Sequence, residues 1–353
     1  MSQTLILAVS PMGEPESSIA RAAALLREGK LVAFPTETVY GLGADATNER
    51  AVAAIFAAKE RPASDPLIVH IADLEQLPTV VAETPPLALE LARRFWPGPL
   101  TLVLPRAEAI PLNVTAGGET VGVRMPASVV AQKLLRAAGV PVAAPSANRF
   151  MRTSPTTAAH VLADLDGRID CVLDGGPCAV GVESTVLDLT ATPPRILRPG
   201  AVTLEALREV APRIDGPATI GAEAIGAEAI ARAPGQMERH YAPRTPLVVF
   251  AGHGKRALAA IRVEAQAALA QEKRVGALLP DIEINALDGL DVRVESLGAD
   301  LAAVSRNLYA ALRALDSAGL DLLITHTYDD EGLGLALNDR LRRAAGGSLR
   351  PVE

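Results

Sequence analysis

The chain has 353 residues, in which 34 lysines and arginines stand against 41 aspartates and glutamates, so its formal net charge is −7 at pH 7. This acidic balance argues against a protein that holds nucleic acid mainly by bulk positive charge. Hydrophobic residues make up 49% of the chain and charged residues 21%, which excludes a disordered or collagen-like protein. At roughly 100–200 residues per domain, the length predicts two domains.

Apolar periodicity predicts alternating helices and strands through the first 210 residues. A helix is expected over 17–29, where apolar residues recur at helical spacing and Gly29 can end the helix, and a strand follows at 31–35. Further helices are expected at 47–60, 85–96, 129–139 and 154–165, and strands at 66–71, 101–105, 120–126, 141–145, 171–176, 184–189 and 195–199. The pattern is typical of a mixed α/β domain that ends near Val210.

From Ala211 to Arg244 the regular periodicity is lost, and the pentad GAEAI occurs twice in tandem over 221–230. We interpret 211–244 as a linker, because one duplicated pentad is too little for a repeat architecture. Strands at 246–252, 274–280 and 320–326 then alternate with helices at 255–271, 297–319 and 335–347. Strict alternation predicts a small parallel, Rossmann-like sheet. The expected division is therefore a domain at 1–210, a linker at 211–244 and an accessory domain at 245–353.

Cysteine usage and the amino terminus give no sign of secretion. Cys171 and Cys178 lie seven residues apart without a C-x-x-C motif, which supports neither a disulfide scaffold nor a zinc site, so both are expected to be small buried residues. The first residues lack a basic segment, and no uninterrupted apolar run of about 18 residues occurs. We therefore expect a cytoplasmic protein that makes no use of a membrane.

The common nucleotide-binding signatures are missing, because the chain has no G-x-x-x-x-G-K-[ST] sequence and no G-x-G-x-x-G after a strand. The nearest feature is Gly252-His253-Gly254-Lys255, which follows an expected strand of the second domain. Two glycines and a lysine at this point can bind an anion at a helix amino terminus, and they can equally form a plain turn. Both interpretations stay open.

Polar loops of the first domain carry the residues best suited to chemistry, and several follow expected strands. The loop at 35–43, PTETVYGLG, offers hydroxyls, a carboxylate and glycines. KERP at 59–62 places two cations at a helix end, where cations also simply favour the helix dipole. PSAN at 145–148 follows a strand, and TSPT at 153–156 is expected to open a helix, where hydroxyls suit phosphate or act as ordinary caps.

Arg124 ends an expected strand, where its planar fork can hold a carboxylate or form a structural salt bridge. His70 lies within an apolar strand and is more often a satisfied core histidine than a ligand or base in such a place. Ser184, Asp188 and Arg198 complete the set. Together these residues predict a pocket rich in cations and hydroxyls, without a Walker loop, a cysteine or a metal cluster. Such a pocket suits an anionic nucleotide together with a small polar carboxylate.

Nine motifs, in this order, carry a resemblance to a known family: PTETVYGLG, KERP, DPLIVHI, WPGPLT, VGVRMP, APSAN, SPT, VESTVLDL and RILRPG. The series resembles the L-threonylcarbamoyl-AMP synthase family, which has a YrdC-like domain, over about residues 20 to 205. APGQMERHYAP, at 233–243, resembles the linker of the longer, two-domain form of that enzyme. The final α/β unit is similar to its accessory carboxy-terminal domain.

The resemblance implies a YrdC-like fold, a twisted, mixed, open α/β sheet that encloses a basic cavity. It also implies that L-threonine, bicarbonate or CO2, and ATP with Mg²⁺ become L-threonylcarbamoyl-AMP and pyrophosphate. The product would then pass to a separate tRNA threonylcarbamoyl transferase, which makes N6-threonylcarbamoyladenosine at adenosine 37 of tRNAs that decode codons beginning with A. Direct binding of tRNA by this chain is left open.

The matching motifs also imply roles for individual residues. L-threonine would be held by Thr36, His70, Arg124, Ala144 and Ser184. ATP would be held by Lys59, Arg61, Thr120, Ser146, Ser154, Arg198 and, from the linker, Tyr241. Arg124 would clamp the threonine carboxylate, and Lys59 and Arg61 would take part in catalysis by stabilising charge on the phosphate chain. A linker that carries Tyr241 across the pocket would act as a lid.

One loop departs from the family pattern. Between Asn148 and Ser154 the family often has a glycine near the position that Met151 occupies here. Where that position requires a positive φ, a methionine costs on the order of 1 kcal/mol or forces another path of the loop.

Two other functions compete with the synthase. The first is a double-stranded RNA- or ribosome-binding module, because YrdC-like domains have a positively charged concave face; the net charge of −7 weakens this hypothesis, although a local patch is compatible with it. The second is a carbamoyl-transferring enzyme that uses carbamoyl phosphate, as larger hydrogenase-maturation proteins do. Those proteins carry zinc-finger-like cysteines and an acylphosphatase-like segment, both missing from this sequence.

Overall fold

The computed structural model describes residues 3–217, 237–347 and 349–352. Within them the chain forms two compact units, and each is presented by itself. The first unit comprises the described parts of Met1–Phe150, Ser154–Ala179 and Glu183–Gln236. The second comprises Met151–Thr153, Val180–Val182 and the described part of Met237–Glu353. The predicted linker at 211–244 therefore lies partly outside the described residues, and the tandem pentads at 221–230 lie wholly outside them.

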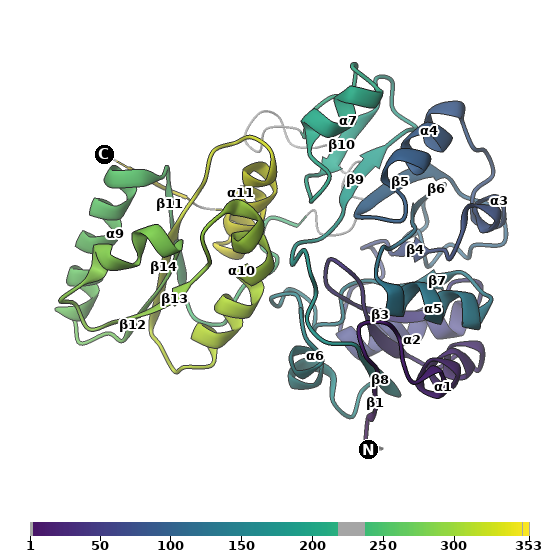
Figure 1. The fold of residues 1–353 in the computed structure, drawn as a ribbon, viewed down its shortest axis with the longest axis horizontal. Coiled ribbons are helices and arrows are strands. Elements are labelled where there is room, and N and C mark those ends of the chain that lie inside the picture. The colour runs from purple at the N-terminus through teal and green to yellow at the C-terminus, as the bar shows by residue number, and fades with distance from the viewer. Residues whose placement is uncertain (1–2, 218–236, 348, 353) are drawn as a thin grey trace. The chain divides into compact units, whose positions relative to one another are not determined.

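The first unit is built on a ten-stranded sheet with helices packed against it (Figure 1). Its elements in chain order are β1 (Leu5–Ala8), α1 (Glu16–Arg27), β2 (Val32–Pro35), β3 (Tyr40–Asp45), α2 (Glu49–Lys59), β4 (Ile68–His70), the 3-10 turn η1 (Leu74–Gln76), α3 (Leu77–Val80), α4 (Pro86–Phe95), β5 (Leu100–Pro105), β6 (Thr120–Arg124), α5 (Val129–Ala138), β7 (Val142–Ala143), α6 (Ala158–Leu165), β8 (Cys171–Asp174), β9 (Thr185–Asp188), β10 (Arg195–Arg198) and α7 (Leu204–Val210).

The strand order is β1-β8-β2-β3-β7-β4-β6-β5-β9-β10. Strands β1, β8 and β2 pair in parallel, as do β4 with β6 and β5 with β9. The other pairings are antiparallel. The sheet is therefore mixed, and the fold class predicted for the first domain is confirmed.

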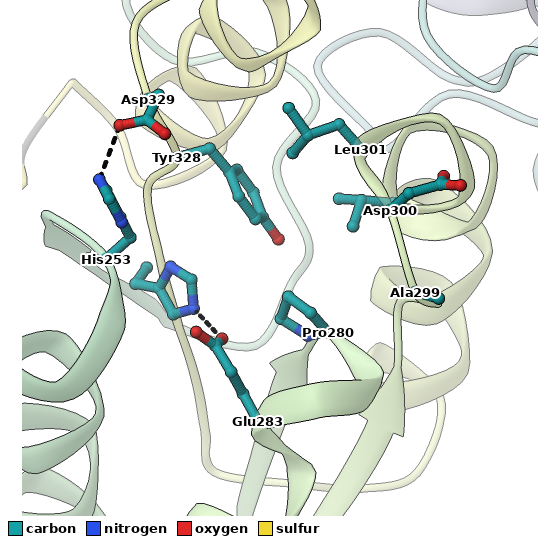
Figure 2. Close-up of a pocket in the computed structure, with 10 residues that line it drawn as sticks. His253, Pro280, Glu283, Ala299, Asp300, Leu301, Tyr328 and Asp329 are labelled. Carbon is teal, nitrogen blue, oxygen red and sulfur yellow. Dashed lines mark hydrogen bonds and ion pairs between the residues drawn. The ribbon is translucent and has the colours of Figure 1, made fainter.

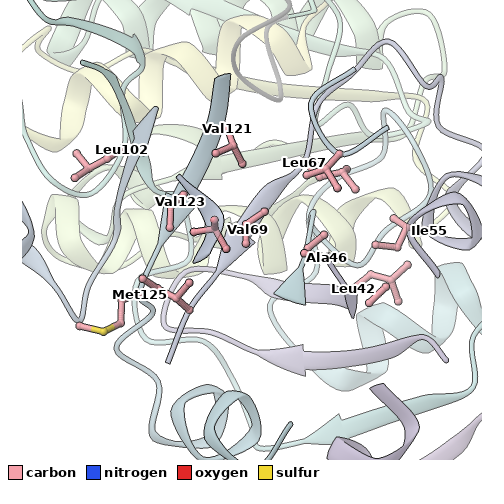
Figure 3. Packing of buried hydrophobic residues seen from close by; sticks show 14 of the residues in the cluster. Leu42, Ala46, Ile55, Leu67, Val69, Leu102, Val121, Val123 and Met125 are labelled. Carbon is pink, nitrogen blue, oxygen red and sulfur yellow. The ribbon is translucent and has the colours of Figure 1, made fainter. Parts of the chain in front are cut away.

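Apolar side chains from the central strands and from α2 form the core of this unit (Figure 3). Val69 of β4 and Val121 and Val123 of β6 are buried, and Ile55 packs with them from α2. Helix α2 is capped by Asn48, whose side chain accepts hydrogen bonds from the N–H groups of Arg50 and Ala51. Each buried aliphatic side chain contributes about 1.5–3 kcal/mol through loss of apolar surface to water. This core fixes the ends of β4 and β6, where several predicted site residues lie.

Two expectations for the first domain are wrong in detail. The stretch at 35–43 is only partly a loop, because β3 begins at Tyr40 and forms an antiparallel hairpin with β2. A side chain at Gly43 would bring its Cβ within 2.8 Å of the Phe34 ring, so close packing of the hairpin requires a glycine. The second correction concerns α6, which is capped by Thr157 and begins at Ala158, so Ser154 precedes the helix and does not open it.

The second unit holds a five-stranded sheet in the order β13-β12-β14-β11-β15, with every pair parallel. Its elements are β11 (Leu247–Ala251), α9 (Gly254–Leu269), β12 (Val275–Leu279), the 3-10 segment η2 (Asp281–Leu287), β13 (Val292–Ser296), α10 (Leu301–Asp316), β14 (Leu322–His326), α11 (Leu333–Ala344) and β15 (Arg350–Pro351). The Rossmann-like architecture is confirmed. Strands β13 and β15 and segment η2 were not predicted.

Two further expectations concern the cysteines and the membrane. Cys171 and Cys178 are free and buried, as expected, and burial raises the pKa of the Cys171 thiol to about 12. Across the described ranges, no helix has the length and apolar character needed to cross a bilayer.

Candidate active site

Arg124, at the end of β6, is the centre of a buried polar cluster. Its Nη2 donates to Glu37 Oε1 at 2.5 Å, its Nη1 to Thr38 Oγ1 at 3.0 Å and its Nε to the Gly98 carbonyl at 3.3 Å. The other Glu37 oxygen accepts from the N–H of Ala127 at 3.0 Å. A guanidinium has five N–H donors, so these described partners leave one donor on each terminal nitrogen. Arg124 is therefore fixed in place and can still hold a second carboxylate.

The loop that supplies Glu37 is held in shape by Thr36. The Thr36 hydroxyl donates to the Val39 carbonyl at 2.7 Å and accepts from the N–H groups of Thr38 and Val39, both at 3.2 Å. Since its proton is used in this way, the 2.8 Å contact between the two threonine hydroxyls has Thr38 as donor. A continuous donor chain therefore runs from Arg124 through Thr38 to Thr36, and Thr36 positions the loop.

His70 ends β4 and pairs in register with Arg124. Its side chain is 3% exposed, its Nδ1 lies 3.3 Å from the Ile68 carbonyl, and the Phe34 ring packs edge-on at 6.4 Å. Burial, and then the charge of Arg124, lower the pKa of His70 to about 3. The imidazole is therefore neutral near pH 7. It adds no charge beside Arg124.

Lys59, the last residue of α2, is 1% exposed and is the most completely buried cation among the described residues of the first unit. Its Nζ donates to the carbonyl oxygens of Ser146 and Asn148, each at 2.5 Å. Burial, and then the neighbouring Arg61, hold the pKa of Lys59 well below its usual value. An ammonium has three donors, so one remains for an anion, and a bound anion would favour the charged form.

Arg61 lies just beyond the same helix and is 8% exposed. Its Nη2 contacts the Pro66 carbonyl at 2.7 Å and Asp65 Oδ2 at 3.0 Å, and its Nε donates to the Asp65 carbonyl at 3.2 Å. Glu60, between the two cations, has a left-handed backbone with φ of 56° and ends α2. Because the chain turns at Glu60, Arg61 lies outside the helix that Lys59 ends.

Ser184 and Arg198 form a second cluster at one end of β9 and β10. Arg198 Nη2 donates to the Ser184 carbonyl at 3.0 Å and to its hydroxyl at 3.2 Å, and that hydroxyl lies 2.8 Å from Thr101 Oγ1. A bulge in β10 makes this contact possible, because Ile196 pairs with Leu187 while Arg198 pairs with Val186. The extra residue turns Arg198 toward Ser184.

Ser154 lies in a third polar contact, where its hydroxyl donates to Glu183 Oε1 at 2.6 Å. Both side chains are buried. Glu183 and Glu37 were not among the predicted site residues, although both lie inside motifs that the sequence singles out. The sequence did hold a signal for both glutamates, because each stands next to a predicted ligand-binding residue in a buried segment. A carboxylate buried in such a place requires a hydrogen-bonding or charged partner.

The remaining predicted residues differ in how the structure places them. Ala144 is buried and its N–H donates to the Ile68 carbonyl at 2.9 Å, and Ser146 contributes its carbonyl to Lys59. Thr120 begins the strand that Arg124 ends, which separates their backbones by roughly 13 Å at strand rise. It therefore lies apart from the Arg124 cluster. No role predicted for these three residues is tested by this placement.

Tyr241 belongs to the second unit. Its ring stacks on Tyr309 at 5.8 Å with an interplanar angle of 27°, and Arg340 lies over it at 5.1 Å. The same unit includes Met151, whose φ is 66° and whose carbonyl accepts from the Ala242 N–H at 3.0 Å. The loop therefore does require a positive φ at Met151, and the methionine adopts it at a cost on the order of 1 kcal/mol.

Metal-ligating side chains are dispersed. Within the described part of the chain, no group of three or more His, Cys, Asp or Glu side chains is arranged to hold a metal ion.

Comparisons with known proteins place both parts of the chain. Residues 24–200 match a family model described as "Telomere recombination", which groups Sua5, YciO and YrdC. Residues 202–346 match a model described as "Threonylcarbamoyl-AMP synthase, C-terminal domain". Among curated proteins, the threonylcarbamoyl-AMP synthase of Pyrococcus abyssi is 46% identical over 94% of this chain and 95% of its own length. That of Bacillus subtilis is 44% identical over 95% of this chain and 94% of its own length.

Among solved structures, the chain is similar to Pyrococcus abyssi Sua5 complexed with L-threonine. The TM-score is 0.92 at 44% sequence identity, and the match covers 99% of this chain and 100% of that one. The similarity therefore covers both units.

Proposed function

The chain belongs to the threonylcarbamoyl-AMP synthase family and is an enzyme that makes threonylcarbamoyl-AMP; we propose that it uses L-threonine, CO2 or bicarbonate, and MgATP, and that most of the site residues belong to the first unit. The observation that carries the function is the match to a synthase at 46% identity over 94% of the chain. The competing hypothesis of an RNA- or ribosome-binding module is not favoured, since relatives over nearly the full length are synthases.

For the amino-acid substrate, we assign the carboxylate of L-threonine to Arg124. Support comes from the two N–H donors that its described partners leave and from the neutral imidazole of His70 beside it. Glu37 holds the guanidinium in one orientation, which reduces the entropy lost on binding. The proposed threonine site is completed by Thr36, Ala144 and Ser184.

For the nucleotide, we assign the phosphates to the buried cations. Lys59 is held by two carbonyl oxygens, which orient the ammonium without neutralising it. The proposed ATP-binding residues are Lys59, Arg61, Thr120, Ser146, Ser154, Arg198 and Tyr241. Mg²⁺ would enter as part of MgATP, bound mainly by the phosphate oxygens.

The chemistry requires positioning and charge stabilisation more than a protein nucleophile. The threonine amine adds to CO2, loses a proton and becomes an N-carboxylate. One carboxylate oxygen then attacks the α-phosphorus of ATP in line, the bond from that phosphorus to the bridging oxygen breaks, and pyrophosphate leaves with the electron pair. We propose that Lys59 and Arg61 stabilise the charge that develops on the phosphates. Held donors of this kind need little reorganisation during the step.

The product is a mixed anhydride, which water hydrolyses. We therefore infer that a separate tRNA threonylcarbamoyl transferase consumes it, for modification of adenosine 37 of tRNA, and that both act in the cytoplasm. Exclusion of water from the site would protect the carbamate and the anhydride.

The test is pyrophosphate release by the purified full-length protein, with L-threonine and bicarbonate each present or omitted and with mass spectrometry of the quenched product. Release that requires both, together with the mass of threonylcarbamoyl adenylate, is expected. Release without threonine, or an adenylate that lacks the carbamoyl group, would contradict the proposed substrates. Arg136→Ala, an exposed arginine outside the site, serves as the matched control for arginine variants.

A further inference from the structure

A cavity of about 240 Å³ lies in the second unit, at the carboxyl ends of its parallel strands (Figure 2). Residues that follow β11, β12, β13 and β14 all contribute to its wall, among them His253, Glu283, Asp300 and Tyr328. The connection from β11 runs toward β12 and that from β14 runs toward β15, in opposite directions along the sheet. Right-handed crossovers then put α9 and α11 on opposite faces, which opens a crevice between two neighbouring strands. Open α/β sheets bind ligands at such places.

Tyr328 is the strongest sign that the cavity receives a ligand. Its side chain is 9% exposed and its hydroxyl points into the cavity, yet across the described residues this hydroxyl has no hydrogen-bond partner (Figure 2). The backbone of Tyr328 is fixed, since its N–H donates to Asn338 Oδ1 and its carbonyl accepts from Asn338 Nδ2, both at 2.8 Å. A buried hydroxyl without a partner destabilises the fold, because it has lost its hydrogen bonds to water and gained none. A ligand group at this position would supply the missing hydrogen bond.

Glu283 faces the same cavity and is oriented by His326. His326 Nδ1 lies 2.7 Å from the Thr327 carbonyl, which only accepts, so Nδ1 carries a proton. His326 Nε2 lies 2.6 Å from Glu283 Oε2. One oxygen of the carboxylate is thereby engaged, and Oε1 has no hydrogen bond within the described part of the chain. Glu283 and Tyr328 both line the cavity, which thus presents a fixed acceptor and a fixed hydroxyl to one ligand (Figure 2).

The charged groups of the wall disfavour an anion, although two of its carboxylates contact His326 and His253. Three carboxylates contribute to it, those of Glu283, Asp300 and Asp329, and no lysine or arginine does. Asp300 caps α10, and Asp329 Oδ1 lies 2.8 Å from His253 Nε2. A phosphate or carboxylate would be repelled here. The anion-binding interpretation of the turn at 252–255 is therefore not supported by this cavity, since Lys255 does not line it.

A hydroxyl-bearing ligand satisfies both groups, and an ammonium ion does not. An ammonium has donors only, so the Tyr328 proton would remain without an acceptor, whereas one hydroxyl can donate to Glu283 and a neighbouring one can accept from Tyr328. Carboxylates after the second strand of Rossmann-like units hold the vicinal hydroxyls of ribose. The volume suits a pentose or the sugar half of a nucleoside.

We propose that this cavity binds a small uncharged ligand with vicinal hydroxyls, which donates to Glu283 Oε1 and accepts from the Tyr328 hydroxyl. The site belongs to the second unit and does not depend on the proposed roles of the synthase residues. Its failure would leave the synthase assignment unchanged.

The test is calorimetric titration of the full-length protein with D-ribose, adenosine, 3′-deoxyadenosine, AMP and ethanolamine, with a non-hydrolysable ATP analogue present to fill the nucleotide site. Ribose or adenosine is expected to bind, with 3′-deoxyadenosine and AMP at least tenfold weaker than adenosine. Ribose binding as strongly as adenosine identifies a free sugar as the ligand, and binding of adenosine alone identifies a nucleoside. No binding of either at 10 mM, or tighter binding of AMP or ethanolamine, would overturn the proposal.

Two variants locate the binding. Tyr328→Phe and Glu283→Gln should each weaken it about tenfold or more, whereas Tyr309→Phe, a buried tyrosine of the same unit outside the cavity wall, should leave it unchanged. Tyr328→Phe has a second readout, because loss of a partnerless hydroxyl should raise the melting temperature of the ligand-free protein. Equal affinity in wild type and both variants, or a lowered melting temperature in Tyr328→Phe, would count against the site.

Discussion

Lys59 of the first unit and Arg343 of the second are both buried cations, and they are held in opposite ways. Lys59 donates to two carbonyl oxygens, which orient its charge and leave it uncompensated. Arg343 donates to Asp339 Oδ1 at 2.9 Å and forms an ion pair within its own helix. Neutral partners therefore keep a buried charge available for an anionic ligand, whereas a carboxylate partner uses that charge for the fold. For Lys59 and Arg343 the partner thus indicates whether a ligand is expected. Arg61, which forms an ion pair with Asp65, would have to share its charge between that carboxylate and the phosphates.

The largest effect is expected at Lys59, where removal of the charge should abolish most of the pyrophosphate release. We expect Lys59→Ala to lower kcat for pyrophosphate release by roughly 100- to 1,000-fold, because it deletes a preorganised donor to the phosphates. The measurement is steady-state pyrophosphate release at saturating substrates. Lys30→Ala, an exposed lysine of the same unit, should retain full activity. A kcat within a few-fold of wild type in Lys59→Ala would show that this charge serves only the fold.

Arg124 tests the intermediate case, a cation that has one carboxylate partner and keeps free donors. We expect Arg124→Lys to raise the KM for L-threonine by roughly 10- to 100-fold, because a point charge cannot replace the planar fork that also holds Glu37. The KM for ATP should change about twofold or less, and both constants come from the same assay. Parallel rises in the two KM values would indicate a general loss of structure and would remove Arg124 from the threonine site.

His70 tests whether the neutral member of the threonine site affects stability. Its pKa is about 3 in the fold, against about 6.5 in the unfolded chain. Between these values the unfolded chain takes up a proton that the folded chain does not, so stability falls as the pH falls. From pH 7 to 4.5 the loss should be about 2–3 kcal/mol in wild type and should be missing in His70→Asn.

Urea denaturation at the two pH values measures this difference, and His253→Asn, at a half-exposed histidine, supplies the baseline. An equal loss in His70→Asn and wild type would show that His70 titrates normally in the fold.

The smallest expected effect is at Met151, which carries backbone strain and no charge. Met151→Gly should raise the free energy of unfolding by about 0.5–1 kcal/mol, since glycine adopts a φ of 66° without a steric penalty. Met12→Gly, at an exposed methionine without a positive φ, should not stabilise the protein. Thermal unfolding followed by calorimetry distinguishes the two. A destabilised Met151→Gly would show that the side chain contributes more than the strain costs.

Apolar periodicity predicted strands whose side chains are almost all buried, such as β4 and β6, because such strands appear as short apolar runs. It missed β3, whose YGLG sequence lacks the side chains that mark a strand. Here the packing of Phe34 against Gly43 requires the glycines, and that packing is a tertiary contact. It also missed β13, an edge strand whose exposed and half-buried residues include Arg293 and Glu295.

The sequence motifs predicted the site residues, but they did not predict the side chains that hydrogen-bond to those residues. Arg124 was singled out at a strand end, yet Glu37, its ion-pair partner, is 87 residues away in the chain. Ser154 was expected to open a helix, whereas it contacts Glu183 ahead of the helix. Local sequence indicates which residues can do chemistry, and only the fold decides which of them meet.

The second unit includes two short segments from earlier in the chain, which limits how its carboxy-terminal part can be exchanged with that of a relative. Met151–Thr153 and Val180–Val182 belong to that unit, although they are encoded far upstream of its main part. A side chain at Gly181 would bring its Cβ within 2.4 Å of the Ser305 carbonyl, and the Ser305 hydroxyl donates to the Val180 carbonyl at 2.8 Å. A carboxy-terminal part taken from a relative must therefore match two loops that stay behind. Chimeras joined at one crossover point should fail unless these loops are transferred with it.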